Sequence, residues 1–482
     1  MPLDRRNFLK ISTASAASSI TGLRCGKNSV VQAQALGVHG NGRADIPEPR
    51  GLTISSNHRF LCDKLTGKPF FLLTDTAWNI NALTYKDIDL YLRDRSAHKF
   101  SAFMFTLNFY PQAQAANVYG QQAYIGPHRT DLNPKYFEYC DYIIHTAAKY
   151  RLYAMVFAMW GGKQAGTMNT YTASQLRTIG LRVGARLKNH DNVILVAGGE
   201  SSPPHIATRY VDAIGSGLKA GCDGRHLVSV HPCGNRSCSE YFAKSAWLDF
   251  YMIQGSSSRH GRYYDMTKLV THDYNLQMIK PTMIAENYYE SGTAQPAVRQ
   301  RRGLYLSVFA GAFGCAYGHD ALWQMSPHTA QRWMLASWPP GVPNWKDALN
   351  THAVEQLHHI RALLYSRPYF SRIPDQSLII SGQGKSIADR VQATRDGTKG
   401  RQNATYLMAY LAAPADVTIN TRVIASHRLN TWWFNPATGK SAMMGMNLPN
   451  TGTLLVKKQR MSHDAVIIVD DALKHYPPPS HG

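Results

Sequence analysis

Short apolar runs alternate with stretches of helical periodicity between about residues 68 and 325. The runs are rich in Val, Ile, Leu, Phe and Met, which is typical of strands covered on both faces of a parallel sheet. Eight runs can be traced, at 69–75, 100–108, 152–162, 192–200, 226–232, 248–255, 280–286 and 314–324. Repeated strand and helix units of this kind predict an α/β fold, a (β/α)8 TIM barrel, over residues 36–370.

The helical stretches between the runs support this prediction. Thr84 and Asp87 have the spacing of a capping box, and Ile88, Tyr91 and Leu92 then share one helix face. Further helices are expected at about 135–150, around Leu176, Ile179, Val183 and Leu187, and near 204–220. A doubly wound open sheet is the alternative, but no phosphate-binding glycine loop follows the first strand.

The pattern changes after the helical stretch 347–367. From Pro374 onward, short alternating strands such as "SLIIS", "ATYLMAYL" and "AVIIVD" are separated by turn residues at near-regular spacing. This predicts a small all-β sandwich domain over residues 374–482.

The N-terminus reads as a targeting segment. "DRRNFLK" (4–10) places two arginines before a weakly apolar stretch, and Ala33-Gln34-Ala35 is a cleavage site of the A-x-A kind. Residues 1–35 resemble a bacterial twin-arginine signal, which implies a periplasmic or extracellular mature protein. No run approaches the ~20 apolar residues that span a bilayer, so no membrane insertion is expected after cleavage.

Charge and cysteines narrow the classes of partner. The 52 Lys and Arg against 31 Asp and Glu give a formal charge of +21, which attracts polyanions such as an acidic polysaccharide. Nucleic acid is not favoured, because no nucleic-acid motif is present. Of seven cysteines one lies in the signal, and we expect the other six to be free thiols, although Cys233 and Cys238 could form a bridge. No metal-ligand spacing occurs and no cofactor is expected.

Chemistry-bearing residues follow the predicted strands. In a (β/α) barrel the carboxyl ends of the strands surround the active site. Carboxylates, amides, imidazoles and indoles at such a site suit a sugar, because polar groups bind hydroxyls and aromatic faces cover C–H surfaces. The candidate substrate-binding residues are Asp75, Trp78, Asn108, Trp160, His231, Gln254, Tyr289, Tyr317, His319 and Trp323.

Two glutamates are the catalytic candidates. Glu200 ends the fourth strand and Glu286 the seventh, so the pair can supply the two carboxylates of glycoside hydrolysis. Retaining enzymes hold such a pair about 5 Å apart and inverting enzymes about 6.5–9.5 Å. The two glycines before Glu200 are expected to leave room for a ligand.

Several segments resemble a known family. "FLLTDTAW", "AMWGG", "NVILVAGGE", "KPTMIAENYYE" and "VRQRRGLYLSVFAGAFGCAYGHDALWQ" are similar to the apiosidase-like catalytic domain, glycoside hydrolase family 140, over roughly residues 55–370. The tail, with "WWFNPATGK", resembles the β-sandwich that follows this domain and carries the name of a collagen-binding domain.

The resemblance assigns roles to both glutamates. Glu286 falls on the catalytic glutamate of the "E-x-x-YE" segment and is implied as the nucleophile. Glu200 falls where the family usually has an aspartate, and its extra methylene changes the geometry by about 1 Å, an amount that can alter a rate ~10²-fold. The acid/base role is therefore implied for Glu200, with the sugar left open.

These expectations converge on an exported glycoside hydrolase. The furanosidic sugar would be apiose or a relative such as arabinofuranose, in a complex plant or bacterial polysaccharide that can be acidic, cleaved by a retaining two-carboxylate mechanism. The alternative is a non-catalytic carbohydrate-binding or adhesion protein on a degenerate barrel. A third possibility is collagen or peptide binding through the tail.

Overall fold

The computed structural model describes residues 48–108, 116–161, 168–255, 265–290, 296–325, 344–458 and 463–480. The expected signal, residues 1–35, lies outside these ranges. Within them no helix has both the length and the apolar character needed to cross a membrane.

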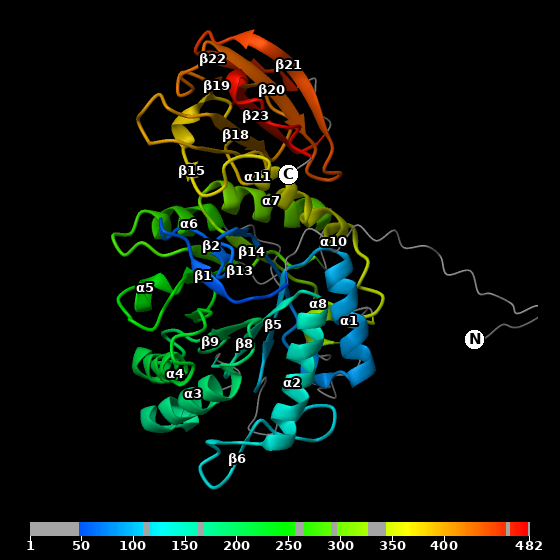
Figure 1. Ribbon diagram of the computed structural model, residues 1–482, viewed down its shortest axis with the longest axis vertical. Helices are drawn as coiled ribbons and strands as arrows, with labels where there is room; N and C mark the ends of the chain where they lie inside the picture. Colours follow the sequence, from blue (N-terminus) through cyan, green and yellow to red (C-terminus); the bar gives the residue numbers. More distant parts are fainter. Residues whose placement is uncertain are drawn as a thin grey trace, which may run out of the picture. The chain divides into compact units, whose positions relative to one another are not determined.

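Eight parallel strands form the wall of a TIM barrel (Figure 1). Their order around the sheet is β10, β9, β8, β5, β4, β14, β13, β12, and β11 (Arg236–Ser237) adds an antiparallel strand beyond β12. Between the ends of this order, the Asp249 backbone N–H donates to the Val228 carbonyl at 2.9 Å, which brings the fifth and sixth strands together. The strands are β4 (Leu72–Thr76), β5 (Ala102–Thr106), β8 (Tyr153–Phe157), β9 (Val193–Val196), β10 (Val228–Ser229), β12 (Tyr251–Gln254), β13 (Thr282–Glu286) and β14 (Gly314–Tyr317). The predicted barrel is confirmed.

Helices cover the outside of the strands (Figure 1). Thr84 caps α1 by accepting from the Asp87 backbone, but the Asp87 carboxylate binds the Thr84 hydroxyl rather than its backbone. The complete capping box instead lies at Thr172 and Gln175. The helices are α1 (Tyr85–Ala97), α2 (Pro134–Lys149), α3 (Ala173–Leu187), α4 (Thr208–Gly221), α5 (Ser239–Phe242), α6 (Met266–Tyr274), α7 (Pro296–Phe309), α8 (Asp320–Gln324), α10 (His352–Leu357) and α11 (His359–Tyr365).

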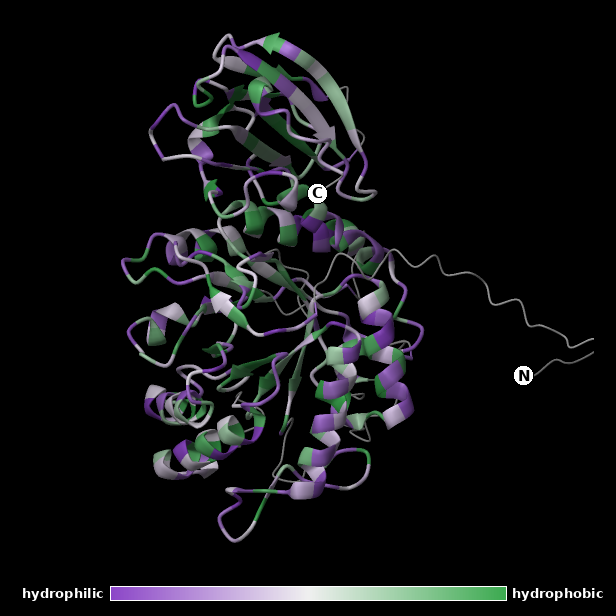
Figure 2. Cartoon of the chain, viewed as in Figure 1, coloured by the Kyte–Doolittle hydropathy of each residue, from purple (hydrophilic) through white to green (hydrophobic). Residues whose placement is uncertain are grey.

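The core follows the apolar runs of the sequence. Every residue of β4, β5, β8, β9, β12, β13 and β14 is buried. Figure 2 shows the corresponding hydrophobic strands inside a ring of helices whose outward faces are hydrophilic. A small antiparallel sheet of β1 (Leu52–Ile54), β2 (Leu61–Asp63) and β3 (Pro69–Phe70) precedes the barrel.

The C-terminal region is the predicted β-sandwich. A sheet in the order β15-β17-β18-β23-β20-β21 faces a second sheet in the order β16-β19-β22. Side chains from both sheets, such as Leu407, Val417 and Ile467, form one core. The strands are β15 (Ile373–Pro374), β16 (Ile379–Ser381), β17 (Val391–Arg395), β18 (Tyr406–Leu411), β19 (Val417–Asn420), β20 (Arg428–Phe434), β21 (Ser441–Pro449), β22 (Thr453–Val456) and β23 (Ala465–Asp471).

Strand β18 shows how the sandwich joins the barrel, because all six of its residues are buried. Leu407 and its alternate neighbours face the second sheet, whereas Tyr406, Met408 and Tyr410 belong to the core cluster of the barrel. The Tyr410 ring stacks on Tyr305 of α7 at 5.0 Å between centroids. The sandwich therefore shares a continuous core with the barrel.

Buried ion pairs reinforce this junction. Arg301 of α7 binds both carboxylate oxygens of Asp464, at 3.0 and 2.6 Å. Arg367, which follows α11, binds both oxygens of Asp470 at 2.8 and 2.7 Å. Two-point pairs of this kind fix the relative position of their elements, and removing one partner leaves a costly buried charge.

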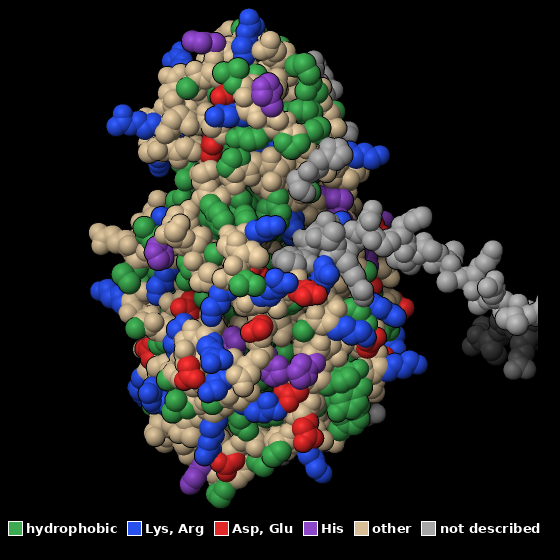
Figure 3. Space-filling view, viewed as in Figure 1, with side chains coloured by type: hydrophobic (Ala, Val, Ile, Leu, Met, Phe, Trp, Pro, Cys, Tyr) green, Lys and Arg blue, Asp and Glu red, His purple; other side chains and the backbone are tan. Residues whose placement is uncertain are grey.

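The six cysteines of the described residues, Cys62, Cys140, Cys222, Cys233, Cys238 and Cys315, are buried free thiols. Cys233 and Cys238 form no bridge. Lys and Arg side chains are spread over the face shown in Figure 3, with Asp and Glu among them, and do not gather in one patch.

Candidate active site

Glu200 stands four residues beyond strand β9, at the carboxyl end of the barrel. Its backbone has a φ of +45°, the left-handed conformation that non-glycine residues rarely adopt. Such conformations cost about 1–3 kcal/mol and concentrate at functional sites. The Cys233 thiol donates to the Glu200 carbonyl at 2.7 Å, and the Ser202 hydroxyl accepts from the Cys233 backbone at 3.0 Å. The strained residue is thus held from the loop after β10.

Gly199 allows Trp160 to reach the site. A Cβ atom at Gly199 would lie 2.1 Å from the Trp160 ring, so no other residue fits beneath the indole. Trp160 also forms a parallel bridge with Gly199, and its side chain lowers the pKa of the neighbouring Glu200 carboxyl. The expectation that the glycines leave room for a ligand was wrong, because Trp160 fills the space beside Gly199.

Glu286 is the last residue of β13, and Gln254 is the last residue of β12. The two are paired in the sheet through an irregularity in the register between Ile253 and Gln254. The Gly255 backbone N–H donates to the Glu286 carbonyl at 2.8 Å, so the two strand ends are tied together.

Gln254 joins the two glutamates. Its Nε2 lies 3.0 Å from Oε2 of Glu286 and 3.4 Å from Oε1 of Glu200. Both oxygens are within reach of one nitrogen, so they lie no farther apart than these two distances laid end to end, 6.4 Å. The structure thus brings together the two acids that the sequence placed on different strands.

His231 and an aromatic cluster enclose Glu286. The imidazole is fully buried, and its Nε2 lies 3.4 Å from the same Oε2 that receives Gln254. The Trp78 ring packs edge-on against His231, with centroids 5.7 Å apart, and against Trp160 at 5.1 Å. The Trp78 indole N–H donates to the Tyr289 hydroxyl at 3.3 Å. His231, Trp78, Trp160 and Tyr289 therefore form the wall beside the carboxylates.

The environment distinguishes Glu200 electrostatically. Burial, and next the negative charge of Glu286, raise the pKa of Glu200 above its ordinary value. His231, Gln254 and Trp160 act in the opposite direction without cancelling the shift of the Glu200 pKa. A raised pKa keeps a carboxyl group protonated at higher pH, which a general acid requires.

Asp75 and Tyr317 lie elsewhere. They are neighbours across β4 and β14, and both side chains enter a buried network on the helix side of the strands. The Asp75 carboxylate accepts hydrogen bonds from the Tyr91 hydroxyl at 2.8 Å and from Nη1 of Arg95 at 3.2 Å. Tyr317 donates to Glu290 at 2.6 Å. Their contacts hold the barrel to α1 and to the segment before α10, and do not reach Glu200 or Glu286.

Asn108, His319 and Trp323 lie at the same end of the barrel. The Asn108 carbonyl accepts from the Trp160 backbone at 3.3 Å. The His319 Nδ1 accepts from Ala321 and so caps α8, while burial lowers the pKa of His319 to about 4. The Trp323 carbonyl receives the backbone N–H of Asn79, the residue after Trp78.

Cys233 is the supporting residue that sequence reasoning missed. The sequence predicted only a free thiol at Cys233, although its position two residues after His231 could have indicated that it lies near the active site. Burial raises the pKa of Cys233 to about 11, so the thiol stays protonated and can donate to Glu200. Among the residues with described positions, no group of three or more His, Cys, Asp or Glu side chains could hold a metal ion.

Comparisons with known proteins agree with this arrangement. Residues 55–371 match the family described as "Apiosidase-like, catalytic domain", and residues 373–470 match the one described as "Putative collagen-binding domain of a collagenase". No curated protein matches the chain.

Two solved structures resemble the whole described fold. A glycoside hydrolase is 27% identical with a TM-score of 0.77, covering 90% of this chain and 99% of its own. A glycoside hydrolase family 5 protein from Bacteroides vulgatus is 25% identical, also with a TM-score of 0.77, over 90% of this chain and 96% of its own. With paired carboxylates at the carboxyl end of a TIM barrel, the chain belongs to the apiosidase-like catalytic domain family and is a glycoside hydrolase.

Proposed function

We propose that the enzyme is a retaining glycosidase in which Glu286 is the nucleophile and Glu200 is the acid/base. The observation that carries this proposal is the Gln254 side chain, which is within reach of both carboxylates and limits their nearer oxygens to at most 6.4 Å. This limit applies to one pair of oxygens and is compatible with the separation of about 5 Å that retaining enzymes keep between their carboxyl groups.

The proposed reaction has two steps. Glu200 gives its proton to the glycosidic oxygen while an oxygen of Glu286 bonds to the anomeric carbon, so the aglycone leaves as a neutral alcohol. Glu200, now a carboxylate, then takes a proton from water, whose oxygen attacks the anomeric carbon and releases Glu286. Burial and the charge of Glu286 raise the pKa of Glu200, which suits the acid role in the first step.

The neighbouring residues would orient this chemistry. Gln254 and His231 both lie against Oε2 of Glu286 and hold that oxygen in place. Oε1 of Gln254 has no hydrogen-bond partner among the described residues, so it can accept a sugar hydroxyl. The Trp78 and Trp160 rings supply apolar surface for the C–H faces of a sugar.

The proposed substrate carries a furanosidic sugar, apiose or arabinofuranose, and membership of the apiosidase-like family supports this choice. The formal charge of +21 favours an acidic polymer by weak attraction. We also propose that the enzyme is exported to the periplasm or the medium, since residues 1–35 have the features of a twin-arginine signal.

A panel of aryl glycosides tests the substrate class. We expect hydrolysis of the aryl apiofuranoside or arabinofuranoside, with kcat/KM at least about 10²-fold above the mannopyranoside and glucopyranoside. The wrong ring shifts its anomeric carbon relative to Glu286, and a misplacement of about 1 Å can cost ~10²-fold in rate. The control is Glu286→Gln assayed in parallel, which should release no phenol from any substrate. Faster cleavage of a pyranoside would overturn the furanoside proposal and leave the two-carboxylate assignment intact.

A further inference from the structure

The turn that precedes β17 in the sandwich, residues 384–390, meets the barrel at the start of helix α6. Nη1 of Arg390 lies 2.9 and 2.8 Å from the two carboxylate oxygens of Asp265, and 2.6 Å from the Thr267 hydroxyl. Asp265 is the N-cap residue of α6, yet its side chain makes no capping bond to the helix. The carboxylate is directed to Arg390 and Thr267 instead.

This turn has its own internal support. The Asp389 carboxylate accepts the backbone N–H groups of Lys385 and Ser386, at 3.1 and 2.7 Å, and the Ser386 hydroxyl at 2.8 Å. The Arg390 carbonyl accepts from the Ala412 backbone at 2.9 Å, which ties it to the residue after β18. Arg390 is therefore presented to the barrel from a fixed position in the sandwich.

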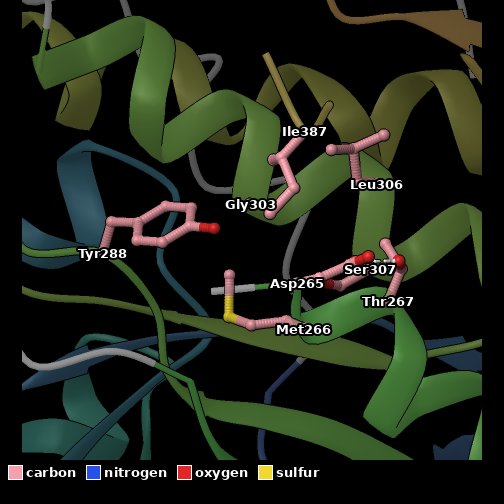
Figure 4. Close-up of a pocket in the computed structure, with 8 residues that line it drawn as sticks. All are labelled: Asp265, Met266, Thr267, Tyr288, Gly303, Leu306, Ser307 and Ile387. Carbon is pink, nitrogen blue, oxygen red and sulfur yellow. Dashed lines mark hydrogen bonds between the residues drawn. The ribbon is translucent and has the colours of Figure 1, made fainter. Parts of the chain in front are cut away.

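Ile387 of the same turn packs near the start of α6, α7 and Tyr288. With Met266, Tyr288 and five further residues it surrounds a cavity of about 10 Å³, room for one water molecule at most (Figure 4). Figure 4 shows Ile387 on one side of this cavity, with Tyr288 and Met266 opposite it. Tyr288 lies two residues beyond Glu286, so the sandwich packs closely against the segment that follows the proposed nucleophile.

Met266 connects the start of α6 with the backbone beside the catalytic residues. A Cβ atom at Gly255 would lie 2.1 Å from the Met266 sulfur, so the thioether rests directly on the Gly255 backbone. Gly255 follows Gln254 and donates its N–H to the Glu286 carbonyl. Successive contacts thus run from Arg390 through the start of α6 to the strand ends that bear Gln254 and Glu286.

We infer that the C-terminal β-sandwich is a positioning element of the active site, which acts through Arg390 on Asp265 and the start of α6 to fix Gln254 and Glu286. The inference rests on the proposed function for the role of Glu286. Displacement of a reacting group by about 1 Å can cost ~10²-fold in rate, so a modest shift of these strand ends is measurable. Arg390 is a positioning residue, since it contacts neither glutamate.

A double-mutant cycle in the full chain tests the inference. Arg390→Gln and Asp265→Asn should each lower kcat about tenfold on the aryl glycoside that the wild type cleaves fastest, with KM changed less than about threefold. The double variant should be no slower than the slower single variant, because both changes break the same link. Arg390→Lys should recover part of the loss, since it retains the charge.

The matched control is Arg302→Gln, which removes another hydrogen bond between barrel and sandwich, from Arg302 Nε to the Ala412 carbonyl at 3.1 Å. Arg302→Gln should leave kcat within about twofold of the wild type, even if it lowers the unfolding temperature as much as Arg390→Gln does. Independent effects of Arg390→Gln and Asp265→Asn, or equal losses of kcat in Arg302→Gln, would overturn the inference.

A second readout needs no substrate. Because the charge of Glu286 raises the pKa of Glu200, a displaced Glu286 should let the Glu200 titration move toward its ordinary value in Arg390→Gln but not in Arg302→Gln. Carbon NMR of protein with labelled glutamate follows this titration. An unmoved titration overturns the inference, whereas a wild type that cleaves no glycoside, with the titration shifted as expected, would overturn only the proposed function.

Discussion

Glu286→Gln is expected to lower kcat by about 10⁴-fold or more while the protein stays folded, because the amide cannot form the glycosyl ester of the first step. The substitution keeps the size of the side chain. It also retains one carbonyl oxygen that can accept from Gln254 Nε2, now 3.0 Å from Glu286. Steady-state rates on the best aryl glycoside, with circular dichroism of the same sample, measure the effect.

Glu290→Gln is the matched control, four positions along the same segment. Glu290 is also buried, but it accepts hydrogen bonds from the Tyr317 and Thr351 hydroxyls and does not touch the site. Tyr317 and Thr351 donate to one oxygen of Glu290 and the Ala353 backbone N–H donates to the other. Replacement of Glu290 should destabilise the protein by about 1–3 kcal/mol, because the amide NH2 of glutamine must face one of these donors and leave it unsatisfied. Activity per folded molecule should remain. Retained turnover in Glu286→Gln, or abolished turnover in folded Glu290→Gln, would show that the nucleophile is assigned to the wrong glutamate.

Glu200→Gln is expected to lower kcat/KM by about 10²–10⁴-fold on substrates with a poor leaving group, and far less with a dinitrophenol, which leaves without a proton. The wild type should lose activity as pH rises through the pKa of Glu200, because only the protonated acid can donate. Burial and the Glu286 charge place this pKa above its ordinary value. Glu200→Gln should lack that decline.

The pH profiles of the two proteins with both leaving groups provide the test. If Glu200→Gln slowed the dinitrophenyl and the poor substrates equally, general acid catalysis by this residue would be excluded. An unchanged alkaline limb in the variant would assign that ionisation to another group.

The barrel and the two catalytic candidates could be predicted from the sequence for a definite reason. Strands such as 192–200 are continuously apolar up to a single carboxylate, and in a barrel the position after the strand determines where that carboxylate lies. The face of the strand to which each side chain points was harder to predict. Asp75 lies next to the last residue of β4, close to the predicted strand end, but it points to the helix side, toward Arg95 and Tyr91. Because successive side chains of a strand point to opposite faces, an aspartate one position earlier or later would have pointed into the barrel.

Two other features depend on the tertiary structure. The left-handed backbone of Glu200 and the bridge made by Gln254 depend on loops and register that no local pattern specifies. The burial of the sandwich against the barrel left a trace in "YLMAYL", which is apolar at alternate and intervening positions. A strand of this kind is covered on both faces, so the segment 374–482 is not a freely separable module. Alone it would expose Tyr406, Met408 and Tyr410, and collagen binding by that fragment would report on a surface that the full chain buries.

The stereochemistry of hydrolysis tests the central claim most directly. Proton NMR of the first-formed sugar, recorded before it mutarotates, gives the anomeric configuration of the product. Two inversions, one at Glu286 and one by water, predict a product with the same configuration as the substrate. A first product of the opposite configuration would contradict the account, because it would require water to attack the anomeric carbon of the substrate directly, with no bond formed between that carbon and Glu286.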